Sequence, residues 1–519
     1  MSQMLKRSGA MAAATMTSRL LGMAREMVYA RFMGDSIEAS AFKFALVVPN
    51  LFRRLLGEGA LSAAFIPIFK EHEKTAGAGA MWRSANAVIS ALIVLACGLI
   101  GIGLLVVSIA LQVDGMPAPT RLMLELVRVM LPYLLLACLA AVLIGMLNAR
   151  GYFFIPALGA GVLNLVMIAS VLFLAPVLGP TLREQVFALA VGVIVAGVAQ
   201  AGFQLPSLWR EGFRFRWVRP WPNETVARVV RQMIPATVGV AAYQINVLCT
   251  QSLAFWVDPT IVATFDYAVR LMELPQGIFG ISMAAYLLPT LSALAADRNY
   301  GEFRTTLRQG LGYVTFSNAL AGALLVALAG PVVRLLFERG QFDPFSTQRV
   351  AVALAWLAPG LLAFSAVNIT ARAFFALGDT QTPMRVSVFC LGLNVVLVLF
   401  LVGPCRHAGL GIANTVSAVL NVSLLLYALR RKLGRIELRG LRRGVLVVVG
   451  VAVVSGLLAW LGAHWWEREF GHRTFGLKLA QVFVPASGAA VVYLGLTTAL
   501  GVDYARDIIR VLLGRGRRS

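Results

Sequence analysis

Apolar residues form long runs that follow one another from end to end of this 519-residue chain. A helix needs about 20 mainly apolar residues to cross the hydrocarbon core of a bilayer. Residues 85–111 contain no charged side chain, and neither do residues 444–463. The runs lack the alternation of apolar and polar residues that marks the strands of a transmembrane barrel. The pattern therefore predicts an all-α polytopic membrane protein.

We predict fourteen transmembrane helices from these runs. The first, second and eighth are the weakest in hydropathy because they contain arginines. The predicted spans are residues 9–33, 41–69, 84–112, 122–149, 155–178, 184–207, 229–256, 261–292, 309–337, 347–376, 382–403, 407–430, 443–464 and 475–500.

Composition and charge support this class. The chain is 59% hydrophobic and only 13% charged, whereas a soluble domain carries about 25% charged residues. The net charge of +22 would suggest nucleic acid in a soluble protein. Here the basic residues cluster in short loops between apolar runs, which is the signature of membrane topology. We therefore expect no nucleic-acid binding, and an even number of spans places both termini in the cytoplasm.

The sequence shows no pattern for a metal, a nucleotide or catalytic chemistry. The five cysteines form no CxxC pair, and the four histidines form no HExxH spacing. We find no phosphate-binding loop for ATP. We therefore expect a transporter without cofactors, driven by the membrane potential or an ion gradient.

Charged residues lie inside some of the apolar runs. Arg53, Arg54 and Glu58 fall in the second span, Arg19 and Arg25 fall in the first, and Arg270 and Glu273 fall in the eighth. A charge near the bilayer centre costs from about 3 to more than 10 kcal/mol, depending on the method. Such residues are expected to face a wet cavity, and arginines there predict an anionic cargo. Guanidinium groups suit phosphate because their planar fork makes paired hydrogen bonds.

Spacing limits what these side chains can do. Arg19 and Arg25 diverge by roughly 120° around a helix. Arg54 and Glu58, four apart, can pair and leave Arg53 for a ligand. Gly57 and Gly59 flank Glu58 and weaken the helix there. Arg270 and Glu273, three apart, can also pair.

A second interpretation of these charges is structural: the arginines reach the headgroups or lock helices together through ion pairs. We favour it for Arg7, Glu26 and Arg31, and the cavity for Arg53, Arg54 and Arg270. Lys43, Arg128 and Arg372 stay undecided.

An internal repeat divides the chain. Pro132, Gly151 and Pro156 recur 227 residues later as Pro359, Gly378 and Pro383. Parallel repeats of this kind are common in transporters that rock one half against the other. The repeat predicts an N-terminal lobe of six helices (1–208), a cytoplasmic linker (209–228), a C-terminal lobe of six helices (229–432), and two further helices with a basic cytoplasmic tail (433–519).

Three segments resemble the MurJ/MviN family of lipid II flippases, in the multidrug/oligosaccharidyl-lipid/polysaccharide exporter superfamily. They are SRLLGMARE (18–26), PNLFRRLLGEGALSAAFIP (49–67) and YAVRLMELP (267–275). The resemblance runs over the whole chain and includes GDTQTP (378–383) and HAGL (407–410).

The resemblance implies a fold and a function. The fold has fourteen helices in two six-helix lobes, with two C-terminal helices that line a groove for the lipid tail. The function is to move lipid II, the undecaprenyl-diphosphate-linked peptidoglycan precursor, across the bacterial inner membrane for cell-wall synthesis and cell shape. We expect a monomer that contacts membrane lipids and other cell-wall synthesis proteins.

The resemblance also assigns site residues. It implies that the arginines line a central cavity, that two acids act beside them, and that four residues support the second-span motif. The cavity arginines are Arg19, Arg25, Arg53, Arg54 and Arg270, the acids are Glu58 and Glu273, and the supporting residues are Pro49, Asn50, Gly57 and Gly59.

The chain departs from the family at two positions. Ser40 and Val269 stand where some relatives carry an aspartate, and Asp266 lies three residues before Val269. Some relatives also bind sodium through acids of the second lobe. The eleventh and twelfth spans contain no acid here, so we expect dependence on the membrane potential.

Two alternatives stay open. Another exporter of the same superfamily, for a different polyprenyl-linked oligosaccharide or for drugs, would share the architecture. A membrane glycosyltransferase or polymerase would need a large external loop, and the longest predicted one, 465–478, is small.

Overall fold

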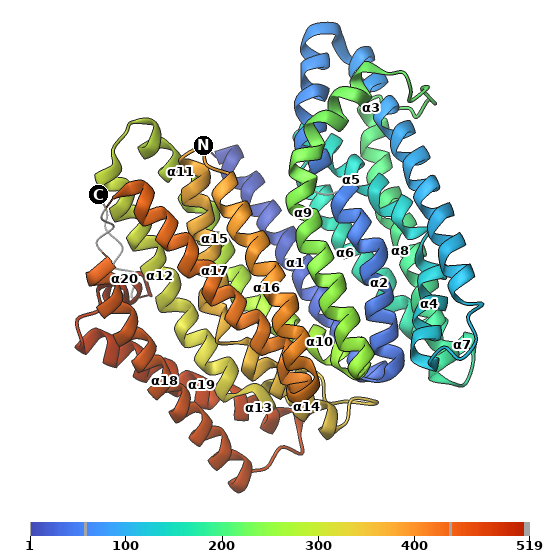
Figure 1. Cartoon of the computed structure of the whole chain (residues 1–519). Coiled ribbons are helices and arrows are strands. Elements are labelled where there is room, and N and C mark those ends of the chain that lie inside the picture. Colours follow the sequence, from blue (N-terminus) through green and yellow to red (C-terminus); the bar gives the residue numbers. More distant parts are fainter. Residues whose placement is uncertain (1, 57–59, 435–437, 513–519) are drawn as a thin grey trace. The chain divides into compact units, whose positions relative to one another are not determined.

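The computed structural model describes residues 2–56, 60–434 and 438–512, and its course is drawn in Figure 1. Within these ranges the regular structure is helical, and no strand occurs. The predicted all-α fold is thus confirmed. The chain divides into two compact units, Met1–Gln251 and Ser252–Ser519. The functional division into lobes, linker and tail stays a prediction.

The first unit is a bundle whose core lies between α3, α5 and α8, around Phe65, Phe69 and Leu147. Its elements are α1 (Ser2–Met33), α2 (Ile37–Leu56), α3 (Ala60–Ala110), α4 (Ala118–Met130), α5 (Tyr133–Ala149), α6 (Phe154–Ala169), the π-helix η1 (Ser170–Leu174), α7 (Ala175–Leu178), α8 (Leu182–Arg210) and most of α9 (Glu224–Val257).

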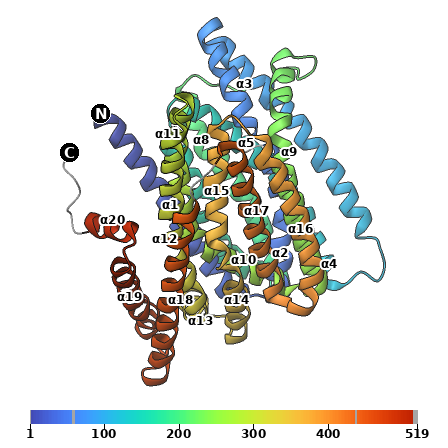
Figure 2. The same cartoon turned by 60° about the vertical axis from the view of Figure 1, so that its left-hand side comes forward.

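The second unit has a core between α11, α12, α15 and α17. Its elements are α10 (Thr260–Pro275), the π-helix η2 (Gln276–Ile281), α11 (Ser282–Ala296), α12 (Tyr300–Ala327), α13 (Ala329–Leu336), α14 (Pro344–Leu357), α15 (Gly360–Ala376), α16 (Gln381–Cys405), the 3-10 turn η3 (Arg406–Ala408), α17 (Gly409–Leu433), α18 (Leu438–Glu469), α19 (Phe475–Ala499) and α20 (Asp503–Leu512). Helices α18 and α19 form a hairpin that packs on α12 (Figure 2).

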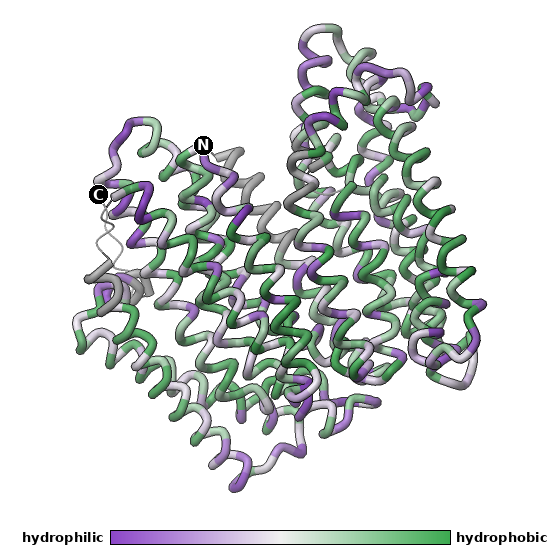
Figure 3. Tube along the Cα trace, viewed as in Figure 1, coloured by the Kyte–Doolittle hydropathy of each residue, from purple (hydrophilic) through white to green (hydrophobic). Residues whose placement is uncertain are grey.

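Hydrophobic residues cover the middles of the helices, and hydrophilic residues gather at their ends and in the loops (Figure 3). Among the described residues, eight helices are long and apolar enough to cross a membrane, or ten if each of two bent pairs is one span. One of the eight, Gln381–Leu433, contains both α16 and α17. The chain is therefore a multi-pass membrane protein, and the count of fourteen crossings stays a prediction.

The internal repeat is visible as local structure. Both bent pairs break at a repeated proline: α4 and α5 meet at 47° beside Pro132, and α14 and α15 meet at 46° beside Pro359. Proline bends a helix because it lacks the N–H and its ring crowds the preceding turn. The same bend thus recurs 227 residues apart.

The repeated glycines close equivalent helix ends. Gly151 (φ 85°) and Gly378 (φ 74°) both have a left-handed backbone, which glycine adopts without steric cost. The following amide donates to the carbonyl five residues before it in both places, Tyr152 to Leu147 and Asp379 to Phe374, each at 2.9 Å. This is the hydrogen bond of a Schellman helix end.

The GDTQTP segment begins α16 with a capping aspartate. Asp379 accepts hydrogen bonds from the Thr382 amide (3.0 Å) and hydroxyl (2.8 Å) and from Lys432 Nζ (2.7 Å). The ammonium group and the Thr382 donors lower the pKa of Asp379 to about 2. The segment therefore fixes the start of α16 and ties it to the end of α17.

The HAGL segment contains a close backbone approach. A Cβ atom on Gly409 would lie 2.7 Å from the Leu401 carbonyl oxygen and 2.9 Å from the Val402 Cα atom. Both neighbours are backbone atoms of α16, which cannot rotate away. Glycine at this position therefore allows the α16–α17 hairpin to close.

We expect Gly409→Ala to destabilise the protein by about 1–3 kcal/mol, because an added methyl group forces packed backbones apart. The check is the unfolding temperature of the purified protein. Gly392→Ala on α16 is the matched control, since no atom lies within 4 Å of its added Cβ. Equal unfolding temperatures for the two variants would contradict this account of the hairpin.

Candidate functional site

The first span contains a buried ion cluster. The Glu26 carboxylate on α1 accepts from Arg25 Nη2 at 2.6 Å and from Lys43 Nζ of α2 at 3.3 Å. The side chains of Glu26 and Lys43 are 3% and 6% exposed, and that of Arg25 is 17% exposed. The structural interpretation of Glu26 is confirmed, and Lys43, which the sequence left undecided, joins α2 to α1.

Aromatic rings surround this cluster. The Arg25 guanidinium lies 5.5 Å from the centre of the Tyr29 ring, and Tyr29 meets Phe42 edge to face at 5.8 Å. A cation over an aromatic face gains attraction that grows as water is removed. Glu26 and the Tyr29 ring thus both contact Arg25, while part of its side chain reaches the surface.

The two arginines of the first span have different surroundings. Arg19 is exposed, one and a half turns before the partly buried Arg25 on α1. Arg31 is also exposed, near the end of α1. The predicted divergence of Arg19 and Arg25 agrees with this difference in burial.

The last turn of α2 carries the arginine pair. Arg53 Nε donates to Asn50 Oδ1 at 3.0 Å. Pro49, which precedes Asn50, is buried. Asn50 thus holds one edge of the Arg53 guanidinium, and the prediction that Arg53 binds a ligand stays a prediction. Arg54 is exposed.

Three further residues of the second-span motif, Gly57, Glu58 and Gly59, lie outside the described residues. The predicted pairing of Arg54 with Glu58 stays a prediction.

The second unit contains the remaining pair. Arg270 Nη1 lies 3.0 Å from Glu273 Oε2, which confirms the predicted pair, and Arg270 Nη2 lies 3.8 Å from Asp266 Oδ1. The Arg270 and Glu273 side chains are 39% and 52% exposed. Asp266 thus supplies a second carboxylate beside Arg270. Because all three side chains are accessible, an anion can compete for the guanidinium.

The second unit contains an apolar cavity. It lies between α12, α15 and α18 and has a volume of about 730 Å³. Val326, Leu362, Val453, Leu457 and Trp460 are among its lining residues. Such a surface suits a hydrocarbon chain. The hydropathy of the individual helices does not predict the cavity, because it forms only where three helices pack together.

The sequence analysis also missed an ion network at the α18–α19 hairpin. Arg334 of α13 contacts Glu467 at 2.9 Å and Glu338 at 3.6 Å, and Lys478 contacts Glu338 at 3.2 Å. The buried Gln481 donates to Glu467 at 3.1 Å. The mixed charge of the 465–478 loop was the available signal. The network fastens the hairpin to the end of α13.

The architecture defines a class of membrane transporter. The structure is similar to an inward-facing MATE family multidrug resistance transporter of the MOP superfamily, with a TM-score of 0.67 and 16% identity over 82% of this chain and 98% of that one. A structure described as lipid II flippase MurJ in an inward closed conformation gives a TM-score of 0.77 at 21% identity, and covers 96% and 99% of the two chains. These likenesses establish the fold.

The sequence comparisons establish the family. The family model described as lipid II flippase MurJ matches residues 29–506. "Lipid II flippase MurJ" of Burkholderia cenocepacia is 33% identical over 506 residues, which cover 95% of this chain and 96% of the relative. "Probable lipid II flippase MurJ" of Vibrio cholerae is 32% identical over 483 residues, 88% and 89% of the two chains. The chain belongs to the MurJ family.

We expect Glu26→Ala to destabilise the protein by about 3–5 kcal/mol, because it removes the carboxylate that two buried cations contact. Glu26→Gln keeps an acceptor and should fall between this variant and the wild type. Denaturant unfolding of the purified protein measures both.

The control for Glu26 is Glu38→Ala at the start of α2. Glu38 is half-buried and has no ion pair among the described residues. Its loss should cost less than about 1 kcal/mol, the value of a carboxylate near a helix N-terminus. A Glu26→Ala effect no larger than this would show that the cluster does not hold α1 to α2.

Proposed function

We infer that this chain is a lipid II flippase, which moves the undecaprenyl-diphosphate-linked peptidoglycan precursor from the inner to the outer leaflet of the bacterial inner membrane. The observation that carries this conclusion is the match of residues 29–506 to the MurJ family. The chemistry of the described residues supports it. The cargo joins a doubly charged diphosphate to a long hydrocarbon, and the chain offers both kinds of contact.

The arginines supply the contact to the diphosphate. Asn50 holds the Nε atom of Arg53 at 3.0 Å and so orients its guanidinium. Arg270 lies beside two carboxylates, which a phosphate displaces as it binds. Charge-assisted hydrogen bonds of this type are about twice as strong as neutral ones. We propose that Arg19, Arg25 and Arg54 are further anion-binding residues, with Glu58 and Glu273 as the exchanging carboxylates.

The apolar cavity between α12, α15 and α18 supplies the contact to the prenyl chain. Its lining is almost wholly hydrocarbon and aromatic, from Val326 on α12 to Trp460 on α18. The prenyl chain of the lipid then stays in an apolar environment while the headgroup crosses the membrane. This arrangement lowers the barrier, since only the polar part has to leave water.

Transport follows an alternating-access cycle. Arginines neutralise the diphosphate, and this neutralisation allows the loaded protein to change conformation. The unloaded arginines carry net positive charge, and one elementary charge is worth about 2.3 kcal/mol per 100 mV of membrane potential. A negative interior therefore favours the return of the empty carrier. We propose this voltage dependence, without a cofactor, for a monomer whose two termini are cytoplasmic.

Depletion of the gene tests the function itself. We expect lipid II to accumulate in the inner leaflet, measured by its access to an externally added enzyme that modifies only outer-leaflet precursor. Accumulation of a different polyprenyl-linked glycan would assign the chain to another exporter of the same fold.

Arg53→Ala should lower transport about 10- to 100-fold, the loss expected for a hydrogen bond to a charged group. The readout is growth on the mutant copy alone, with membrane insertion checked by immunoblot. Arg31→Ala, an exposed arginine of α1, is the control and should support growth. Normal growth with Arg53→Ala would remove Arg53 from the binding site.

A photoreactive amino acid at position 453 should crosslink to the prenyl chain of lipid II several-fold more strongly than the same residue at position 454. Val453 lines the apolar cavity and Val454 does not, although the two are 53% and 47% exposed. Mass spectrometry of the crosslinked lipid measures the ratio. Equal crosslinking at the two positions would show that the prenyl chain binds elsewhere on the protein.

A further inference from the structure

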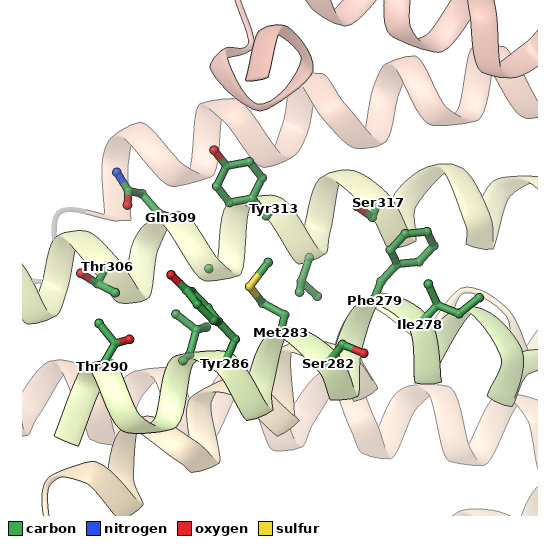
Figure 4. A pocket seen from close by; sticks show the side chains of 13 residues that line it. Ile278, Phe279, Ser282, Met283, Tyr286, Thr290, Thr306, Gln309, Tyr313 and Ser317 are labelled. Carbon is green, nitrogen blue, oxygen red and sulfur yellow. The ribbon is translucent and has the colours of Figure 1, made fainter. Parts of the chain in front are cut away.

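A second pocket of the Ser252–Ser519 unit differs from the apolar cavity in its chemistry. It lies between η2–α11 and α12 and has a volume of about 580 Å³. Figure 4 shows polar side chains on both of its walls. They are Ser282, Tyr286 and Thr290 from α11, and Thr306, Gln309, Tyr313 and Ser317 from α12.

These groups are neutral. The hydroxyls of six of these residues and the amide of Gln309 can each donate and accept hydrogen bonds, and no charged side chain of the described residues lines the pocket. Phe279 and Met283 add apolar surface beside them. A pocket with apolar walls and a few placed polar groups is the usual form of a small-molecule site. This lining fits an uncharged ligand that is rich in hydroxyl and amide groups.

The hydrogen-bonding capacity of several lining groups is unused. Within the described part of the chain, the side chains of Thr290, Thr306 and Gln309 form no hydrogen bond. Tyr313 donates its hydroxyl hydrogen to Asp507 of α20 at 2.6 Å, so its oxygen can still accept. A ligand can therefore bind here without breaking existing bonds of these four residues.

The π-helix turns this pocket toward the face that carries Arg270. A single π turn adds about one residue to the helix. All following residues are therefore rotated back by about 100° around the helix axis. Ser282 follows Arg270 by twelve residues. In an unbroken α-helix the two would diverge by about 120°, and with the π segment they diverge by only about 20°. Arg270 and Ser282 thus lie on nearly the same face, about 17 Å apart along the axis.

We propose that this pocket binds the neutral glycan part of the transported lipid while Arg270 binds its diphosphate. This inference rests on the proposed function. The separation along one helix face requires an extended ligand with a charged and an uncharged polar end, which a diphosphate followed by sugar rings provides. Helix α12 continues from the pocket (Thr306 to Ser317) to the apolar cavity (Ala319 to Ala327), so one helix contacts a polar group and a hydrocarbon in sequence.

A phospholipid acyl chain is the rival occupant. It would use Phe279, Met283 and Leu287 but leave the hydroxyl and amide groups without partners. Burying such groups unbonded is unfavourable. Hydrogen-bonding groups lie on both walls of the pocket, with Ser282 and Tyr286 on one and Thr306 and Gln309 on the other. This arrangement favours a sugar over an acyl chain as the ligand.

The test compares two lipids on the full-length protein in nanodiscs. Lipid II carries the glycan, and undecaprenyl diphosphate lacks it. We expect Thr306→Val and Gln309→Leu each to weaken lipid II binding about two- to tenfold, the effect of one neutral hydrogen bond, and to leave undecaprenyl diphosphate binding unchanged. Thr305→Val is the matched control, because its exposed hydroxyl bonds only to Gly301 of its own helix.

The outcomes separate the two proposals. Arg270→Ala should weaken both lipids equally, which tests the diphosphate contact alone. If wild-type protein binds neither lipid, the proposed function fails. If wild-type protein binds both but the Thr306 and Gln309 variants keep the wild-type ratio, or lose both lipids alike, the glycan pocket is wrong. An unchanged ratio together with a retained phospholipid in native mass spectrometry identifies an acyl-chain site instead.

Discussion

The constraint on which this structure depends is the cost of charge in a membrane-spanning helix. Glu26 shows how the chain meets it: two cations, Arg25 and Lys43, contact one buried carboxylate, and an aromatic ring covers one of them. Such a cluster adds little net stability over apolar packing, yet removing one partner is costly. Its consequence is a fixed placement of α1 and α2, the two helices that carry the basic motifs of the first unit. The buried Glu26 and Lys43 thus position the helices that carry the arginines proposed to meet a ligand.

Arg53 and Arg270 are less buried than Glu26 and Lys43. Each is only partly exposed to solvent and has a polar neighbour, Asn50 for the one and two carboxylates for the other. These partners orient each guanidinium, and both groups stay partly accessible to an anion. A fully buried pair, such as Glu26 with Lys43, has no such access. Burial therefore distinguishes structural charges from those available for binding, and composition alone cannot.

The sequence was sufficient for features with a local cause. Run length predicted the helices, and the repeated Pro132 and Pro359 marked bends that the structure places at 47° and 46°. The spacing of Arg270 and Glu273 predicted their ion pair. Lys43 stayed undecided because its partner lies 17 residues away on another helix. The contact of Arg53 with Asn50 went unnoticed in the sequence, although a side chain three residues earlier on a helix is within reach.

Features that depend on packing or on helix phase were beyond the sequence. The Arg334 network joins residues more than 130 positions apart, and neither cavity has a sequence signature, because serine and threonine are common in membrane helices. The π segment at Gln276–Ile281 matters most. It changes which residues share a face with Arg270, so a helical wheel drawn from the sequence places Ser282 on the wrong side. Because π segments are rare and frequent at functional sites, this phase shift is consistent with the ligand-binding face proposed for Arg270 and Ser282.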